Sequence, residues 1–552
     1  MDGPHVHIKR VSSETISINV VGGTDNIQYI HRLFEEYMSF YTEDYKYDNR
    51  YKSGIWDGKI RFVGTYGGKM LAPAGLLPLI VTLLRNNEVP TVVEESCKGM
   101  FLDKDAESST IRWLDTIKGK LKYDPEPHQQ KMVISAMKYK RVVLESPTGS
   151  GKSMGITLTA FRYLDSNANG RVLIMVPSVS LVDQMYDDIE EYTKKDMSNL
   201  IGRVYGDDKI DKDEEFDKQI VISTVSSVGY RIGVLVPKIK GKVVPIKVDK
   251  NLTKIFGMVI IDEVHGASST TLQKIIATCS NADYRIGFTG TVPLENVPAH
   301  VIFGAIGPKV VIITTKELID MGILSDVTIV GMVLNYDDSA IKKVQKMKYE
   351  SEVAAIESNG SRQKVFDYLY ELGYISKDTN TMMLFNYRES IENMKEYIES
   401  KYKDLKVLTF HGDVSPEDKK AARNIMEANP GYILLATFGA AAAGVSIRRL
   451  HNLILASSYK KYIRVIQSIG RALRVHPTKT MAMVFDIIDN ITKVYKNSYK
   501  ENHMVKHWRA RLALYKMQEF KVKKLEYPDK FSIPDNIVLH EGSESIADEW
   551  GL

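Results

Sequence analysis

The stretch RVVLESPTGSGKS, residues 141–153, runs from a short apolar strand through a glycine-rich loop into the start of a helix. Glycines leave backbone N–H groups open to a phosphate, and a helix N-terminus adds positive partial charge. The lysine supplies a point charge for the β- and γ-phosphates, and the serine after it can ligate Mg²⁺. The loop departs from the usual motif at one position, where Ser146 replaces the first glycine. A glycine-rich surface turn is the alternative, and the strand before the loop and the helix after it argue against that alternative. We therefore predict that a nucleoside triphosphate binds to Thr148, Gly149, Ser150, Gly151, Lys152 and Ser153, with Mg²⁺ on Ser153.

A second apolar strand, 258–261, is followed at once by Asp262-Glu263-Val264-His265. Carboxylates at the carboxyl end of a buried parallel strand lie beside the phosphate loop in doubly wound folds. We predict that Asp262 holds Mg²⁺ and that Glu263 orients and deprotonates the attacking water. His265 is placed to sense the γ-phosphate side of the site.

A third group of candidates lies in the second half of the chain, where Gln467, Arg471 and Arg474 are spaced i, i+4 and i+7. On a helix these positions share one face. Arginine has a permanent charge and a fork that matches phosphate oxygens, so this face is predicted to reach nucleotide held by the first half. A solvated basic helix face is the alternative.

The fold class follows from apolar strands that alternate with helical patterns between about residues 105 and 500. Continuous Val/Ile/Leu runs of this kind suit parallel strands buried on both faces; they lie at 141–144, 172–176, 220–223, 258–261, 381–385 and 433–436. We predict two tandem RecA-like doubly wound α/β domains with a small α+β N-terminal module and a helical C-terminal extension. The predicted boundaries are 1–100, 101–315, 316–500 and 501–552, the last being a helix with an acidic tail.

Composition excludes several classes of protein. The 44% hydrophobic and 26% charged content argues against a disordered or fibrous chain, and the net charge of +5 names no partner. The two cysteines, Cys97 and Cys279, form no CxxC pair, which argues against a zinc ribbon, an iron–sulfur cluster or a dithiol redox site. So few cysteines suit a reducing cytoplasm. The uncharged run 70–84 is too short to cross a membrane and is predicted to be core. The neutral total hides a predicted basic helix, 491–525, followed by an acidic tail, 526–552.

The order of these motifs resembles that of the superfamily 2 helicases, in their DExH branch. The resemblance implies that Gln129, 23 residues before Lys152, reads adenine, and that Gly444 lies near the nucleotide. It also implies nucleic-acid contacts in several motifs of both halves, at Pro177, Ser178, Thr224, Thr289, Thr291, Asn386, His411, Gly412 and Thr437.

A closer similarity is to the phage UvsW-type recombination helicases. It includes the signature YKSGIWDGKIR at 51–61, which implies nucleic-acid contacts at Trp56, Lys59 and Arg61, and FDIID at 485–489. It implies an ATP-dependent DNA helicase or translocase that remodels forks, Holliday junctions and R-loops and anneals strands in phage recombination and repair. The implied cofactors are ATP and Mg²⁺. The implied partners are branched, single-stranded and duplex DNA, RNA in R-loops, and recombination or single-strand-binding proteins. The implied location is the host cytoplasm, without a membrane.

Residues 41–66 carry seven aromatic side chains interleaved with five cations, a composition that suits either a nucleic-acid surface or an ordinary core. Three other functions share parts of the pattern. An RNA helicase shares every core motif. A restriction-nuclease motor subunit would need a nuclease centre, for which 416–419 (PEDK) is the nearest stretch. A DNA-binding scaffold would need a broken Lys152, Glu263 or Arg471, and all three are intact.

Overall fold

The computed structural model describes residues 5–66, 69–205, 213–239, 242–243, 247–344, 347, 349–357, 359–442, 447–458, 462–495 and 498–533. The chain divides into two compact units. The first comprises Met1–Ser146 and Ser150–Ile313, and the second Thr314–Leu552 with the three loop residues Pro147–Gly149.

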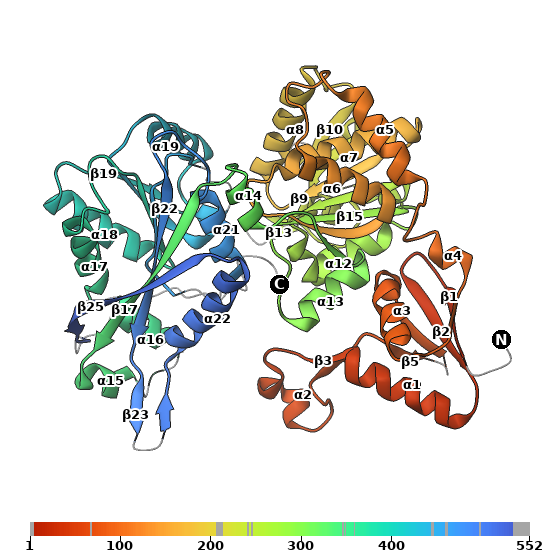
Figure 1. The fold of residues 1–552 in the computed structure, drawn as a ribbon, viewed down its shortest axis with the longest axis horizontal. Coiled ribbons are helices and arrows are strands. Elements are labelled where there is room, and N and C mark those ends of the chain that lie inside the picture. The colour runs from red at the N-terminus through yellow and green to blue at the C-terminus, as the bar shows by residue number, and fades with distance from the viewer. Residues whose placement is uncertain are drawn as a thin grey trace. The chain divides into compact units, whose positions relative to one another are not determined.

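The first unit contains a seven-stranded, all-parallel sheet in the order β10-β11-β9-β14-β15-β8-β16. Its strands are β8 (Arg141–Glu145), β9 (Val172–Val176), β10 (Ile201–Val204), β11 (Ile220–Thr224), β14 (Met258–Asp262), β15 (Tyr284–Thr289) and β16 (Lys309–Val311). The central strands are mainly apolar because helices cover both faces of the sheet (Figure 1). On one side lie α5 (Ala106–Ile117), α6 (Pro127–Tyr139), α7 (Lys152–Ser166) and α8 (Val179–Thr193); on the other lie α12 (Thr270–Thr278) and α13 (Asn296–Ala305), with α11 (Val225–Arg231) beside α12.

The second unit repeats this architecture with a seven-stranded parallel sheet in the order β19-β20-β18-β21-β22-β17-β25. The strands are β17 (Asp326–Tyr336), β18 (Thr381–Phe385), β19 (Lys406–Phe410), β20 (Tyr432–Thr437), β21 (Asn452–Leu455), β22 (Met481–Asn490) and β25 (Lys521–Phe531). The helices are α14 (Thr315–Asp320), α15 (Asp338–Val344), α16 (Tyr349–Glu357), α17 (Ser361–Glu371), α18 (Arg388–Lys401), α19 (Pro416–Ala428), α20 (Phe438–Ala442), α21 (Tyr462–Ala472) and α22 (His503–Met517). The prediction of two RecA-like doubly wound domains is confirmed.

The C-terminal segment differs from the prediction. We expected a basic helix from 491 to 525, whereas the described residues form a hairpin (β23, Lys493–Tyr495; β24, Ser498–Lys500), the helix α22, and then β25, which is the edge strand of the sheet. Along β25 the side chains of Val522, Leu525 and Tyr527 are half-buried, whereas its lysines are exposed. Lysines and a proline on an edge strand also discourage pairing with another chain. The acidic tail beyond residue 533 lies outside the described residues.

The N-terminal module of the first unit is a small α+β structure, as predicted. Its five-stranded mixed sheet has the order β5-β6-β2-β1-β7, and α1 and α3 complete the module. The strands and helices are β1 (His5–Arg10), β2 (Thr15–Val21), β5 (Gly64–Tyr66), β6 (Lys69–Pro73), β7 (Thr91–Val93), α1 (Thr24–Tyr37), α3 (Leu77–Asn86) and α4 (Glu95–Lys98). The uncharged run 70–84 forms β6 and α3 and contributes to the core of the module, as expected.

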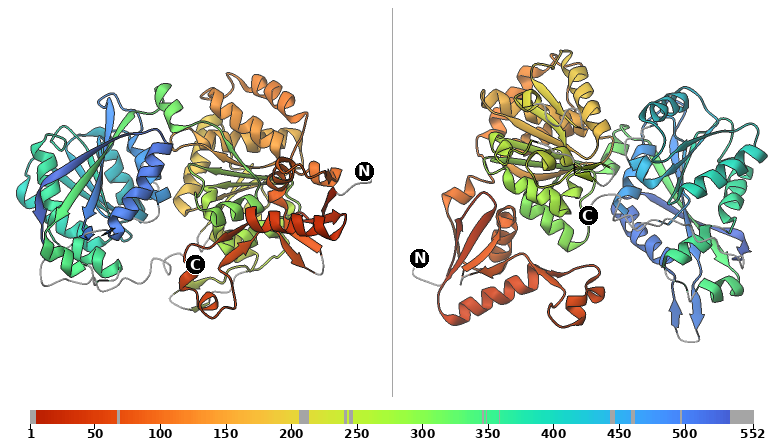
Figure 2. Two further views of the ribbon diagram at one scale, coloured as in Figure 1. Left: turned by 60° about the horizontal axis from the view of Figure 1, so that its bottom comes forward. Right: turned by 180° about the vertical axis from the view of Figure 1, so that it is seen from behind.

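A separate two-stranded element projects from this module; we call it the tip. It comprises residues 39–61: β3 (Ser39–Tyr41), η1 (Tyr45–Tyr47), α2 (Asn49–Lys52) and β4 (Lys59–Arg61). The tip lies at the opposite end of α1 from β1 and β2 (Figures 1 and 2).

The module is joined tightly to the first parallel sheet. Glu14, in the turn between β1 and β2, accepts hydrogen bonds from Arg285 at the start of β15, one of them 2.8 Å long. Arg141 at the start of β8 donates to the Ser13 carbonyl at 2.7 Å. Gly75 meets α13 so closely that a Cβ there would lie 2.1 Å from the Phe303 carbonyl oxygen. The module and this sheet therefore form one compact unit.

Candidate nucleotide-binding and hydrolysis site

The phosphate loop follows β8 and ends at the first residue of α7. Gly149 and Gly151 have φ of +90° and +78°, a backbone region that residues with a Cβ adopt only with strain. Ser146, in place of the usual glycine, donates its buried hydroxyl to the Ser150 hydroxyl at 2.7 Å and so closes the loop from inside. The Lys152 ammonium group donates to the Ser146 carbonyl at 3.3 Å, which keeps its charge at the loop.

The start of α6 supports this loop. The His128 ring Nε2 lies 2.8 Å from the Ser150 carbonyl oxygen, and the Gln129 amide donates to the same oxygen at 3.2 Å. The Gln129 side-chain oxygen accepts from the Glu126 backbone N–H at 3.0 Å and caps the helix. The structure thus brings Gln129 to the predicted ATP site, where its amide holds the loop.

The acidic pair lies at the carboxyl end of β14, two strands from β8 in the same sheet. Burial, and then the neighbouring Glu263 carboxylate, raise the pKa of Asp262 to about 7, while Lys152 and His265 act in the opposite direction. Glu263 has a left-handed backbone, with φ +52°, at the turn into the following short helix. A site with crowded carboxylates and one lysine fits a divalent cation, because the cation removes the cost of keeping both acids charged.

His265 connects the acidic pair to the end of β15. Its Nδ1 lies 3.3 Å from a Glu263 carboxylate oxygen and 3.2 Å from the Thr289 hydroxyl. The Thr289 carbonyl accepts from the Ser146 backbone N–H at 2.9 Å. The three segments predicted to handle ATP, namely the loop, the acidic pair and the end of β15, therefore share one hydrogen-bonded network.

Two supporting residues escaped the sequence analysis. The Tyr192 hydroxyl, on α8, lies 2.7 Å from the Ser153 hydroxyl, the predicted Mg²⁺ ligand. Glu145, the last residue of β8, accepts from the Val292 backbone N–H at 2.8 Å and pairs with Lys309 at 2.9 Å. Neither belongs to a recognisable motif, so only the fold reveals them. Ser153 and Asp262 remain the side chains suited to hold Mg²⁺, and the loop suits a triphosphate.

In the second unit, Gln467 and Arg471 lie on α21, one turn apart. The predicted common face for Arg474 is wrong, because α21 ends at Ala472. Leu473 instead lies in a turn, where its carbonyl accepts from the Ser325 N–H at 2.7 Å, and Arg474 forms an isolated β-bridge with Leu324. Gly444 lies outside the described residues.

Most predicted nucleic-acid contacts of the first unit follow the carboxyl ends of its strands. Pro177 and Ser178 follow β9, and Pro177 is exposed. The Thr224 side chain is buried and caps α11 by accepting from the Ser227 N–H at 3.1 Å. Thr289 and Thr291 are both buried, and the Thr289 hydroxyl contacts His265 and the Thr291 carbonyl, so both residues lie at the predicted ATP site rather than on an open surface.

In the second unit, the corresponding candidates also follow strand ends. Asn386 follows β18 and donates to the Ser458 carbonyl at 3.1 Å. His411 and Gly412 follow β19; His411 is buried and Gly412 is exposed. The Thr437 hydroxyl, at the end of β20, accepts from the Ala440 N–H at 3.2 Å. Each sheet therefore gathers its motif residues at one edge, where doubly wound folds bind ligands.

The signature residues of the tip are engaged within the protein. The Trp56 indole N–H donates to the Lys59 carbonyl at 2.9 Å, and the Arg50 guanidinium lies 4.8 Å from the ring centre. Lys59 pairs with Glu35 at 3.2 Å, and Arg61 pairs with both Glu35 and Asp57. The Arg61 hydrogen bond holds the pKa of Asp57 down to about 2. These cations are neutralised locally, which weakens the prediction that they contact phosphates.

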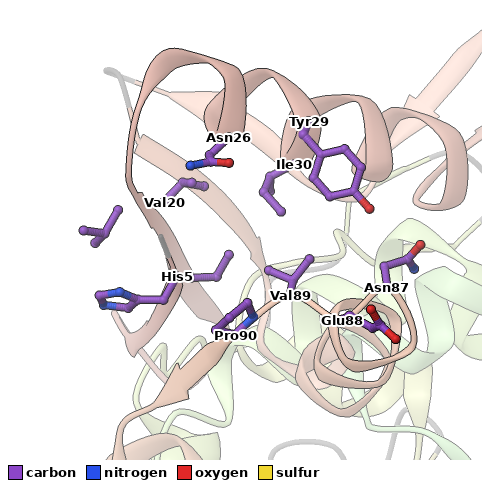
Figure 3. A pocket seen from close by; sticks show the side chains of 11 residues that line it. His5, Val20, Asn26, Tyr29, Ile30, Asn87, Glu88, Val89 and Pro90 are labelled. Atoms are coloured by element: carbon purple, nitrogen blue, oxygen red, sulfur yellow. The ribbon is translucent and has the colours of Figure 1, made fainter. Parts of the chain in front are cut away.

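Several other features of the described residues lie apart from the predicted ATP site. A hollow of about 170 Å³ lies between β1, α1 and the turn after α3, with Tyr29 at its side (Figure 3). It is smaller than ordinary cofactor pockets.

The nearest nuclease-like stretch, Pro416 to Lys419, is the first turn of α19, capped by Ser415. In the described ranges no group of three His, Cys, Asp or Glu side chains is arranged for a metal, and no helix is long and apolar enough to cross a bilayer. Cys97 and Cys279 are both buried and unpaired.

Comparison with known proteins agrees with this geometry. Three family models match the chain in order: the N-terminal domain of the DNA helicase UvsW at residues 15–94, the type III restriction enzyme res subunit at 113–294, and the helicase conserved C-terminal domain at 364–476. The ATP-dependent DNA helicase uvsW of Enterobacteria phage T4 is 27% identical over 498 residues, which are 89% of this chain and 94% of that one.

Two solved structures share the fold at low sequence identity. The ATP-dependent type ISP restriction-modification enzyme LlaBIII, bound to DNA, matches 77% of this chain and 32% of its own, with TM-score 0.53 and 14% identity. A fragment of a putative HsdR subunit of a type I restriction enzyme from Vibrio vulnificus YJ016 matches 70% of this chain and 67% of its own, with TM-score 0.50 and 16% identity.

The fold, the phosphate loop and the matched models define the class of protein: a superfamily 2 helicase with two RecA-like domains. Within that class the chain matches the UvsW type, in its N-terminal domain and along nearly its whole length. The resemblance predicted from the sequence is confirmed.

Proposed function

We propose that this protein is an ATP-dependent DNA helicase or translocase that remodels forks, Holliday junctions and R-loops and anneals strands in phage recombination and repair. The observation that carries the proposal is the hydrogen-bonded network that joins the phosphate loop, Glu263, His265 and Thr289. Such a network links the groups that hold ATP to the motif that follows β15. The similarity to the T4 helicase supports DNA as the substrate.

The catalytic roles follow from chemistry and position. Magnesium, when bound at Ser153 and Asp262, neutralises charge on the β- and γ-phosphates. Lys152 and the loop N–H groups bind the phosphates, and Glu263 holds the attacking water and takes its proton. Gln467, Arg471 and Arg474 are proposed to act on the same γ-phosphate from the second unit, which would add on the order of a thousandfold or more to the rate.

The nucleic-acid strand is proposed to lie along the carboxyl edges of both sheets, next to Pro177, Ser178, Gly412 and Thr437. Recombination or single-strand-binding proteins, RNA in R-loops and a place in the host cytoplasm are parts of the same proposal. An RNA substrate is the rival that shares all of the core motifs. The restriction-motor rival has a similar fold in its favour but no nuclease centre among the described residues.

The test is the ATP hydrolysis rate with single-stranded DNA, duplex, fork, four-way junction and RNA, compared at one ionic strength because phosphate contacts are salt-dependent. We expect forked or branched DNA to stimulate hydrolysis most. Lys152→Ala should abolish turnover and leave DNA binding largely intact. Equal rates with and without DNA would favour a scaffold, stronger stimulation by RNA would favour the RNA helicase, and native turnover in Lys152→Ala would refute the loop assignment.

A further inference from the structure

Tyr192, near the end of α8, contacts the serine that follows Lys152 in the phosphate loop. Its hydroxyl lies 2.7 Å from the Ser153 hydroxyl, and both residues are half-buried. The two positions are 39 residues apart in sequence and meet because α7 and α8 pack against each other. A serine oxygen has one O–H to donate and two lone pairs to offer, so a fixed partner sets the direction of all three.

The other serine hydroxyls of the loop are engaged within it. The Ser146 hydroxyl donates to the Ser150 hydroxyl at 2.7 Å, and both residues are buried. The Ser153 hydroxyl, by contrast, contacts a helix that begins at Val179, outside the loop. The direction of the Ser153 hydroxyl is therefore set by α8 rather than by the loop.

The end of α8 is itself held from outside the helix. The Lys122 backbone N–H donates to the Tyr192 carbonyl at 2.8 Å, which satisfies a carbonyl in the last turn of the helix. The neighbouring Glu191 carboxylate accepts from the Lys122 ammonium group at 2.7 Å and from the Tyr123 hydroxyl at 3.1 Å. These three hydrogen bonds fasten Tyr192 to the segment that precedes α6.

That segment leads directly into the residues that hold the phosphate loop. The His128 ring and the Gln129 amide, at the start of α6, contact the Ser150 carbonyl oxygen at 2.8 and 3.2 Å. One short stretch of chain therefore supports the loop on one side and the end of α8 on the other. Tyr192 and Ser153 are held against each other by this stretch as well as by their own contact.

We propose that Tyr192 is a positioning residue for the Mg²⁺ ligand Ser153: its oxygen accepts the serine O–H, so that both serine lone pairs remain free for the cation. A serine that accepted from the phenol instead would use one lone pair there. Partners behind a metal ligand orient that ligand, and their removal typically lowers metal affinity about 10- to 100-fold. This inference rests on the proposed function, because it takes Ser153 as the ligand, and it adds a residue from a helix outside the phosphate loop.

The test uses the full chain and a non-hydrolysable fluorescent ATP analogue, mant-AMPPNP, whose dissociation constant is measured in EDTA and in saturating Mg²⁺. The ratio of the two constants is the gain in affinity that Mg²⁺ gives. Tyr192→Phe keeps the ring and removes the hydroxyl, so we expect this gain to fall about tenfold or more. The dissociation constant in EDTA should stay at the native value, because the serine then has no cation to bind, whereas a disturbed fold would raise it.

Two further variants separate this role from a general one. Ser153→Ala removes the ligand and should lower the gain, and adding Tyr192→Phe to it should cause no further loss, since Tyr192 acts through Ser153. Tyr186→Phe is the matched control, because Tyr186 lies on the same helix and its hydroxyl donates to Glu190 at 2.8 Å. It should leave both dissociation constants at their native values.

The proposal is overturned if Tyr192→Phe keeps the native gain, if it weakens binding equally with and without Mg²⁺, if it lowers the gain further in the Ser153→Ala chain, or if Tyr186→Phe has the same effect. A native chain that binds the analogue equally in EDTA and in Mg²⁺ would overturn this inference together with the metal assignment. ATP turnover that DNA does not stimulate would instead defeat the proposed function and leave the Mg²⁺ result standing.

Discussion

Glu263 is the residue that we propose as the general base for ATP hydrolysis. Its backbone is left-handed, and its carboxylate lies 3.3 Å from the His265 ring, so the side chain is held at the exit of β14. Glu263→Gln keeps the shape but cannot accept a proton from water. We expect ATP hydrolysis to fall about 10²- to 10⁴-fold, the usual contribution of a general base, while ATP binding persists. Single-turnover hydrolysis and equilibrium ATP binding measure the two quantities.

Glu295→Gln is a suitable control for that variant, because Glu295 is an exposed acid at the start of α13 in the same unit. It should hydrolyse ATP at nearly the native rate. A loss of ATP binding as large as the loss of hydrolysis in Glu263→Gln would show that this residue shapes the site rather than activating water.

Lys479 is a buried lysine whose charge is poorly compensated. It donates to the carbonyls of Arg448, Leu450 and Ala472, the last being the end of α21. Burial lowers the pKa of Lys479 to about 8. The unfolded chain, with a pKa near 10.5, binds more protons between these values, so the free energy of unfolding gains up to about 3 kcal/mol from this group as the pH rises from 8 to 10.5.

Lys479→Met removes this contribution. We expect the free energy of unfolding of the variant, measured with denaturant, to fall progressively further below that of the native chain between pH 7.5 and 9.5. A difference that stays constant across that interval would mean that Lys479 titrates alike in the folded and unfolded chains.

At the scale of elements, α22 is fixed to β22 by a buried ion pair. The Arg511 guanidinium donates two hydrogen bonds of 2.8 Å to Asp486, which also accepts from the Tyr515 hydroxyl at 2.8 Å. Removing one partner leaves a buried charge unpaired, which costs about 3–5 kcal/mol. Arg511→Met should therefore lower the thermal unfolding midpoint markedly and loosen α22 and β25 in hydrogen exchange.

Two further variants sharpen that measurement. Replacing both partners, Asp486→Leu with Arg511→Met, should be milder than the single change, because no charge remains buried. Lys98→Met, which removes an exposed pair with Glu95, should have little effect. If Arg511→Met were as benign as Lys98→Met, the pair would have no structural importance.

The elements also show what the sequence could and could not predict. Strands with continuous apolar runs, such as β9 and the first four residues of β14, were predictable because both of their faces are covered, and the loop after β8 has a motif of its own. β25 was not, since an edge strand with alternating lysines looks like part of a basic helix. Arg474 was misplaced because nothing in the spacing marks the end of α21. The Glu14–Arg285 and Ser153–Tyr192 contacts join positions far apart in sequence, and no local pattern encodes them.

At the scale of the molecule, the N-terminal module and the first RecA-like sheet should unfold together. Glu14 belongs to the module, whereas its partner Arg285 is buried in the sheet. Arg141 lies nearby, and burial, followed by repulsion from Arg285, lowers the pKa of Arg141. Glu14→Ala leaves these guanidiniums without their carboxylate. We expect calorimetry to show a loss of about 3 kcal/mol or more in the whole first unit.

The comparison for that experiment is Glu95→Ala, which removes an exposed acid of the same module. It should shift the transition by no more than a few tenths of a kcal/mol. Separate transitions for the module and the sheet, with only the former sensitive to Glu14→Ala, would contradict the single unit.

The burial of both cysteines has a practical consequence. Burial raises the pKa of the Cys279 thiol to about 12 and raises that of Cys97 as well, so neither supplies thiolate to a maleimide at neutral pH. Because its own cysteines do not react, the native chain can be labelled with a maleimide dye at a single introduced cysteine. Tyr47→Cys and Met517→Cys, at two exposed positions in different units, would carry a donor and an acceptor, and energy transfer between them would follow the motions of the motor through each cycle of ATP turnover.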